Sequence, residues 1–178
     1  MIGLAGSHRT GKTTLAKAWA EQNDIEYITP NVKGVIATFG KTCDLIDSVD
    51  ERIEIQRRIV QSCSNTFLRR KKVFITDRTP IDVAAYTLAD AGQNLTDKQA
   101  NDLNEIVMDC IELTNSSFFS LCLVQPGIPY VTEKGSPMPN VAYQEHIHTL
   151  IQGLMRDERV KVSTWAIPRH NTDHDDRL

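Results

Sequence analysis

One short stretch restricts the fold of this sequence more than any other. Residues 6–13 read Gly-Ser-His-Arg-Thr-Gly-Lys-Thr, after an apolar run at residues 2–6 and at the start of a helical pattern at residues 12–22. Glycines at this spacing let the backbone curl so that successive N–H groups point inward at phosphate oxygens. The N-terminus of the following helix adds partial positive charge. The stretch therefore predicts a strand, a phosphate-binding loop and a helix, with a nucleotide bound at the loop.

Two side chains at the end of this loop have defined roles in phosphate chemistry. Lys12 is spaced to reach the β- and γ-phosphates, and Thr13 offers a hydroxyl to Mg²⁺. We therefore expect ATP and Mg²⁺ as cofactors. The alternative is a glycine-rich turn that carries Lys-Thr by chance. The expected nucleotide-binding residues are Gly6, Ser7, His8, Arg9, Thr10, Gly11, Lys12, Thr13 and Thr14.

The rest of the sequence alternates short β-like runs with longer helical patterns, which predicts a parallel sheet covered by helices. At 178 residues, we expect one domain over residues 1–178, with a full hydrophobic core. Strands are expected at residues 2–6, 25–28, 73–77, 118–124 and 160–165. Helices are expected at residues 12–22, 49–70, 80–91, 100–113 and 141–155, the fourth preceded by capping-box spacing from Thr96 to Gln99.

Three segments show no clear periodicity, and we interpret them as loops. Residues 29–47 form the expected acceptor-site region, and residues 168–178 form a polar tail. Residues 125–140, rich in Pro and Gly, are of the length at which compact domains keep a lid or substrate loop. The tail holds a run of His and Asp that superficially resembles a metal site, but a mobile polar segment is the expected interpretation.

Composition excludes several classes of protein and of partner. The formal net charge of −3 argues mildly against attraction to a polyanion, and no apolar run approaches the roughly 20 residues of a membrane-spanning helix. No secretory signal is evident. The four cysteines form no CxxC pair, so we expect buried free thiols and a cytoplasmic protein, in the host cytoplasm if the source is viral.

A carboxylate and a guanidinium follow the third expected strand. Asp77 closes the strand at residues 73–77, and Arg78 comes directly after it. Ligands of open α/β sheets bind beyond the carboxyl ends of the strands, so Asp77 is expected in the same crevice as the phosphate loop. It could hold Mg²⁺ or accept a proton from an attacking hydroxyl, and Arg78 supplies a planar fork for phosphate. The alternative makes Asp77 a helix N-cap and Arg78 its surface ion-pair partner.

Together, the phosphate loop and the pattern Asp77-Arg78-x(6)-Ala85-Tyr86 resemble the P-loop nucleoside and nucleotide kinases, and most of all the thymidylate kinase group. The resemblance extends loosely to nicotinamide-riboside kinase domains and to small phage-type kinase-like ATPases. It implies a three-layer α/β/α fold with a five-stranded parallel sheet in the order 2-3-1-4-5. The chain departs from the thymidylate kinase pattern at His8, where an acidic residue is common, and at Thr79, which replaces an aromatic.

The resemblance also implies roles for individual residues. Lys12, Thr13 and Arg9 would contact the ATP phosphates, Asp77 would work with Mg²⁺, and Arg78 would clamp the acceptor. Residues 125–140 hold only Lys134 as a cation, so Arg9 becomes the expected counterpart of an arginine finger. The expected catalytic residues are thus Lys12, Arg9, Asp77 and Arg78, and the expected metal ligands are Thr13 and Asp77.

Candidate acceptor-binding residues are fewer and less specific. The Gln56 amide could pair with a base edge, as a glutamine on the equivalent helix does in deoxynucleoside kinases, or could face solvent. Phe39 could stack on a base or fill core. Asp82 and Tyr86, on the helix after Arg78, complete the set.

These observations favour a kinase that moves the γ-phosphoryl group of ATP to a nucleoside, a nucleotide or a related small acceptor. One alternative is a kinase acting on a hydroxyl of DNA, either a modified base such as 5-hydroxymethyluracil or a strand end. A third hypothesis is an ATPase switch with no acceptor other than water. A homodimer is compatible with the sequence, and no membrane partner is expected.

Overall fold

A five-stranded parallel sheet organises the computed structural model, which describes residues 1–41, 48–130, 140–173 and 175–177. The strands are β1 (Ile2–Ala5), β2 (Glu26–Ile28), β3 (Phe74–Thr76), β4 (Ser120–Val124) and β5 (Ser163–Ile167). Their order is β2-β3-β1-β4-β5, and every neighbouring pair is parallel. The predicted sheet and its strand order are confirmed.

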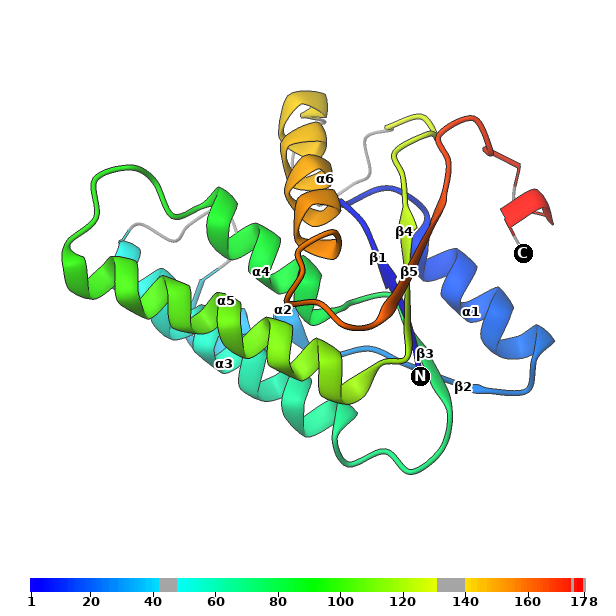
Figure 1. Cartoon of the computed structure of the whole chain (residues 1–178), viewed down its shortest axis with the longest axis horizontal. Coiled ribbons are helices and arrows are strands. Elements are labelled where there is room, and N and C mark those ends of the chain that lie inside the picture. Colours follow the sequence, from blue (N-terminus) through cyan, green and yellow to red (C-terminus); the bar gives the residue numbers. More distant parts are fainter. Residues whose placement is uncertain (42–47, 131–139, 174, 178) are drawn as a thin grey trace.

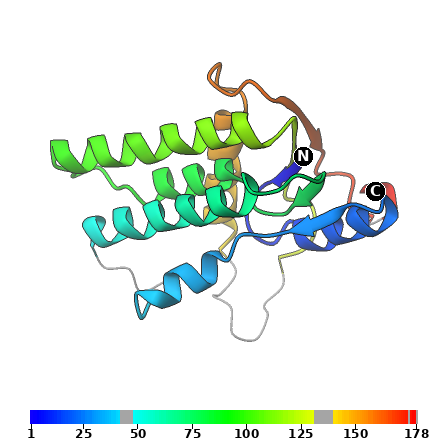
Figure 2. The same cartoon turned by 90° about the horizontal axis from the view of Figure 1, so that it is seen from below.

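Helices cover both faces of this sheet (Figure 1). One face is covered by α1 (Lys12–Gln22), and the other by α3 (Val49–Phe67), α4 (Pro80–Ala89), α5 (Asp97–Ser117) and α6 (Val141–Met155). The short helix α2 (Val32–Thr38) lies alongside α3 (Figure 2). The buried apolar side chains form two clusters, a smaller one that includes Leu4, Leu15 and Ile75 and a larger one that includes side chains of α3 to α6. The three-layer α/β/α architecture is therefore confirmed.

Side-chain caps explain where several helices begin. The Thr96 hydroxyl accepts from the Gln99 N–H, and the Gln99 side chain accepts from the Thr96 N–H. This predicted capping box places the start of α5 at Asp97, three residues before the expected start at Ala100. A second capping box, between Thr79 and Asp82, starts α4 with proline at its first turn.

The region 29–47 and the start of β5 differ from the sequence-based expectation as well. The region 29–47 contains α2. Asn31 caps the start of this helix, because its side-chain oxygen accepts from the Gly34 N–H at 3.0 Å. Two helical turns carry too weak a periodicity to stand out in a sequence, and the apolar face of α2 is stabilised by packing against the larger core. Strand β5 begins at Ser163 rather than at Val160, because its pairing with β4 starts where Ser163 lies opposite Ser120.

Parts of the expected loops lie outside the described residues. These are residues 42–47 in the acceptor-site region, with Cys43, and residues 131–139 in the lid-like segment, with Lys134. The other three cysteines, Cys63, Cys110 and Cys122, are buried free thiols as predicted. Among the helices of the described ranges, none combines the length and apolarity needed to span a bilayer.

Candidate nucleotide and phosphoryl-transfer site

The phosphate loop connects the end of β1 to the start of α1, and its glycines meet two different demands. A Cβ atom on Gly6 would lie 2.6 Å from the Val124 carbonyl oxygen, so only glycine allows this approach to β4. Gly11 adopts a φ of 84° as the N-cap of α1, a left-handed conformation that costs other residues about 1–2 kcal/mol. The loop therefore curls over the N-terminus of α1 as the sequence predicts.

Lys12 spans this loop from the first turn of α1. Its Nζ donates to the Gly6 and Ser7 carbonyl oxygens at 2.5 and 2.7 Å. The pKa of Lys12 is lowered to about 8, mainly by burial; the charge of Arg78 acts in the same direction, and the charges of Asp82 and Asp77 act in the opposite direction. An ammonium with this depressed pKa gains stability when phosphate charge is placed beside it.

Asp77 lies directly after β3 and meets Thr13 across the crevice. The Thr13 hydroxyl donates to Asp77 Oδ2, whereas the buried Asp77 Oδ1 has no hydrogen-bond partner among the described residues. Burial and the Asp77 charge raise the pKa of Tyr27, in the middle of β2, to about 12, so a phenol lies beside the same carboxylate. A hydroxyl and a carboxylate with one unpaired oxygen fit the oxygen ligands that Mg²⁺ prefers.

The interpretation of Asp77 as the cap of α4 is wrong, because Thr79 is the N-cap. Arg78 is not part of a surface ion pair either: within the described ranges, its guanidinium makes no ion pair or side-chain hydrogen bond. Its charge nevertheless acts on both Lys12 and Tyr86. Arg78 thus contributes uncompensated positive charge near Lys12, where an anionic group would be stabilised.

Asp82 lies beneath the loop with a side chain only 1% exposed. Its Oδ1 accepts from the Gly6 N–H at 2.9 Å, and its Oδ2 accepts from the Thr79 N–H and hydroxyl, each at 2.7 Å. Both oxygens are therefore used in joining the phosphate loop to the start of α4. The structure places this expected acceptor-binding residue in a supporting position, which the spacing Thr79-x-x-Asp82 could have indicated as a capping box.

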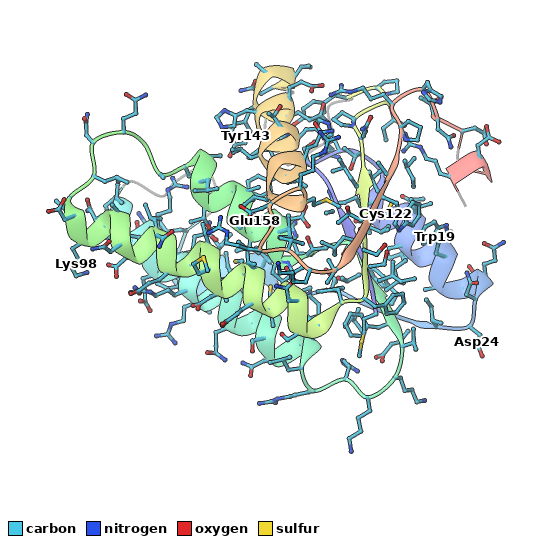
Figure 3. All side chains as sticks on the ribbon, in the orientation of Figure 1. Trp19, Asp24, Lys98, Cys122, Tyr143 and Glu158 are labelled. Carbon is cyan, nitrogen blue, oxygen red and sulfur yellow. The ribbon has the colours of Figure 1, made fainter. Side chains whose placement is uncertain are left out.

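His8 connects the phosphate loop to two helices on the other side of the crevice. Its Nδ1 lies 3.2 Å from the Tyr86 hydroxyl, and its carbonyl oxygen accepts from Gln144 Nε2 at 2.7 Å. The His8 ring also lies 5.3 Å from the ring of Tyr130 and 5.9 Å from that of Tyr143, which Figure 3 labels on α6. Burial, Lys12 and Arg9 lower the pKa of His8, which favours the neutral ring at neutral pH.

The structure brings some of the expected acceptor residues to this crevice and leaves others elsewhere. Tyr86 contacts His8 of the loop. Gln56 is only 8% exposed, so the solvent-facing interpretation is wrong, and its amide has no hydrogen-bond partner among the described residues. Phe39, just after α2, lines a groove of about 1040 Å³ between α2 and α3 that contains no residue of the phosphate loop.

Sequence reasoning did not find Tyr130, Tyr143, Gln144 and Tyr27, although all four take part in the site. Tyr143 also donates to Asp90 Oδ1 at 3.1 Å, and Asp90 forms an ion pair with Arg52 of α3 at 2.5 Å. The only signal available in sequence was the clustering of aromatic and amide residues at the start of α6, which is also typical of ordinary packing.

The fold and the loop define this chain as a P-loop nucleotide-binding domain. A family model described as AAA domain matches residues 1–163, and the chain belongs to that family. No curated protein sequence matches the chain significantly. This family membership agrees with the predicted P-loop class of the chain.

Solved structures of similar fold include two of particular interest. Deoxyadenosine kinase from M. mycoides with bound dCTP matches with a TM-score of 0.69 and 12% identity, over 99% of this chain and 94% of that one. NadR protein in complex with NR matches with a TM-score of 0.68 and 13% identity, over 98% of this chain and 45% of that one. The chain therefore spans less than half of that NadR chain.

Proposed function

We propose that this chain is an ATP-dependent phosphotransferase that moves the γ-phosphoryl group of ATP to a hydroxyl of a nucleoside, a nucleotide or a related small acceptor. The observation that carries the proposal is the meeting of three groups beside the phosphate loop. These are the Thr13–Asp77 pair with its unpaired oxygen, the partly buried ammonium of Lys12, and the guanidinium of Arg78 without an ion-pair partner in the described ranges.

Each group has a role in the proposed transfer. Mg²⁺ held by Thr13 and Asp77 would offset charge on the phosphates. Lys12 is placed to bind the β- and γ-phosphates, Arg9 takes the role of an arginine finger, and Arg78 orients the acceptor side. The acceptor hydroxyl oxygen forms a bond to the γ-phosphorus, and the bond from that phosphorus to the β–γ bridging oxygen breaks. ADP leaves with the electron pair, and the hydroxyl proton passes to Asp77 or to solvent.

The positions of side chains on and before α4 and on α3 support the proposed acceptor site. Arg78 directly precedes α4, and Tyr86 of α4 contacts His8 of the phosphate loop. Gln56 lies on the buried face of α3 and has no hydrogen-bond partner among the described residues, so its amide is available to pair with a base edge. The similar fold of deoxyadenosine kinase and of the NadR protein supports a nucleoside or nucleotide as the acceptor.

The test is ADP formation from ATP and Mg²⁺ with a panel of deoxynucleosides, nucleoside monophosphates, nicotinamide riboside and oligonucleotides. A small acceptor that raises ADP release and appears as a phosphorylated product supports the proposal. Phosphorylated oligonucleotide without a small-molecule product would support the DNA alternative, and ADP release that no acceptor changes would support the ATPase switch. Lys12→Ala serves as the inactive control throughout.

A further inference from the structure

The segment after β5, expected to be a mobile tail, is folded in its described part. Figure 1 shows its last turn, η1 (Asp175–Arg177), on the α1 side of the sheet. Arg169 forms a two-point ion pair with Glu145 of α6, with both distances 2.6 Å. Asn171 holds the end of the segment, because its side chain donates to the Asp176 carbonyl oxygen at 2.9 Å and its own carbonyl accepts from Arg177 Nε at 2.6 Å.

This arrangement buries Arg177 against the phosphate loop. The residue is 6% exposed, and its Nη1 donates to the Thr10 carbonyl oxygen at 3.1 Å. The same Nη1 lies 3.6 Å from where a Cβ on Gly11 would be, so the guanidinium lies directly beside the N-cap of α1. Nη2 is buried and has no hydrogen-bond partner, and Arg177 makes no ion pair with any described residue.

A buried guanidinium with one unpaired nitrogen and no counter-ion is costly to dock. The carbonyl of Thr10 offsets only part of that cost. The loop that Arg177 contacts is the one whose N–H groups are expected to bind phosphates. Phosphates bound there would bring two or more negative charges to the neighbourhood of a cation that makes no ion pair with the described residues. Charges attract more strongly near a buried group, because the effective dielectric constant there is low.

We propose that Arg177 is a positioning residue for nucleotide binding. Its guanidinium docks on the Thr10 carbonyl more firmly when phosphates occupy the loop. The docked guanidinium in turn holds the loop in its phosphate-binding conformation. The inference rests on the nucleotide-binding part of the proposed function and not on the transfer step. Because linkage is reciprocal, an effect of Arg177 on nucleotide affinity requires an equal effect of nucleotide on the docking of residues 168–177.

The first arm of the test measures the dissociation constant of the ATP analogue AMP-PNP with Mg²⁺ by titration calorimetry. Arg177→Met removes the charge and both hydrogen bonds but keeps an apolar stem, and we expect about tenfold weaker binding. Arg177→Lys keeps the charge, but a lysine cannot reach the carbonyl oxygens of Thr10 and Asn171 together. Its affinity for AMP-PNP should lie between those of Arg177→Met and wild type. The matched control is Arg159→Met, which removes an exposed arginine that forms an ion pair with Asp157 and contacts Met108 Sδ. The affinity of this variant for AMP-PNP should equal that of wild type.

The second arm measures amide hydrogen exchange of the wild-type protein with and without AMP-PNP. The Asn171 and Asp176 amides donate within the folded segment, to the Pro168 carbonyl and to Asp173, so they report its docking. The proposal expects their exchange to slow when nucleotide binds. A merely structural role for Arg177 would lower stability in the variants without making this exchange depend on nucleotide.

The outcomes separate this inference from the proposed function. Unchanged affinity in Arg177→Met, or exchange of the Asn171 and Asp176 amides that nucleotide does not alter, would overturn the role of Arg177 while leaving the kinase proposal intact. Nucleotide binding that depends on Arg177, without phosphorylation of any acceptor, would overturn the kinase proposal alone. A wild-type protein that binds no AMP-PNP would overturn both. If Arg177→Met fails to fold, the lysine variant and the wild-type exchange experiment still decide.

Discussion

Replacing Asp82 by asparagine separates a supporting role from an acceptor-binding role. The aspartate accepts three hydrogen bonds, one from Gly6 and two from Thr79, in a site that is 1% exposed. Asparagine keeps one acceptor oxygen, but its NH₂ group must replace an oxygen that now faces N–H donors. Loss of one charge-assisted bond, at about 1.5–3 kcal/mol, and an unsatisfied buried donor, at about 1–3 kcal/mol, together predict a destabilisation of about 3 kcal/mol or more.

The assay is urea unfolding of Asp82→Asn, followed by circular dichroism. The unfolding equilibrium constant should rise by at least about a hundredfold, since 1.36 kcal/mol corresponds to a factor of ten. The matched control is Asp97→Asn, an exposed residue in the first turn of α5, which should lose no more than about 1 kcal/mol from the helix dipole. An unfolding midpoint equal to wild type, combined with a raised KM for the acceptor alone, would refute the supporting role and restore the acceptor interpretation.

Asp82→Asn has a second consequence, in the pH dependence of activity. The pKa of Lys12 is about 8, and the negative charge of Asp82 keeps it from falling lower under the effect of burial. Without that charge, Lys12 should lose its proton at lower pH, so the alkaline fall of kcat/KM for ATP should move to lower pH than in wild type. The position of this fall is measured on the folded fraction of the variant.

Four further predictions concern the phosphate loop and its partner at the end of β3. Lys12→Ala should leave the urea-unfolding midpoint near that of wild type, while ADP formation falls by about a thousandfold or more. The reason is that the lost charge acts mainly on the transferring phosphoryl group. Near-normal ADP formation would exclude the site. Asp77→Asn should lower kcat far more than ATP affinity and leave stability unchanged, because Thr79 and not Asp77 caps α4; a lowered unfolding midpoint with normal kcat would contradict this. In wild type, kcat/KM for ATP should fall as pH rises through about 8, since the folded pKa of Lys12 lies below the ordinary lysine value of 10.5 and the charged form is lost first in the folded protein. The same shift makes folding stability rise between about pH 8 and 10.5, because the unfolded chain still binds this proton there; a flat profile of kcat/KM up to pH 10 would be the contrary result. Gly11→Ala should cost about 1–2 kcal/mol in urea unfolding, because φ is 84° at that position, whereas an unchanged midpoint would mean that the loop relaxes to another conformation.

The local features of this protein are visible in its sequence. The glycine spacing of residues 6–13, the alternation of strands and helices and the capping box at Thr96 each involve residues close together in the chain. Their physics is local as well: backbone freedom at glycine, a helix N-terminus and a side chain that caps it. For the same reason, the sequence misses α2 and misplaces the start of β5, whose bounds depend on packing and on pairing with a neighbouring strand.

Only the tertiary structure decides how the site is supported. Asp82 holds the N–H of Gly6 across 76 positions, His8 meets Tyr86 across 78, and Arg177 reaches Thr10 across 167. Periodicity says which face of a helix is apolar, but it does not say which polar groups from distant elements become neighbours. The sequence by itself therefore determined the phosphate loop and the class of fold. The folded chain determined that Asp82 supports the loop and that Arg177 docks on it, because these contacts join residues that are far apart in the chain and meet only in the tertiary structure.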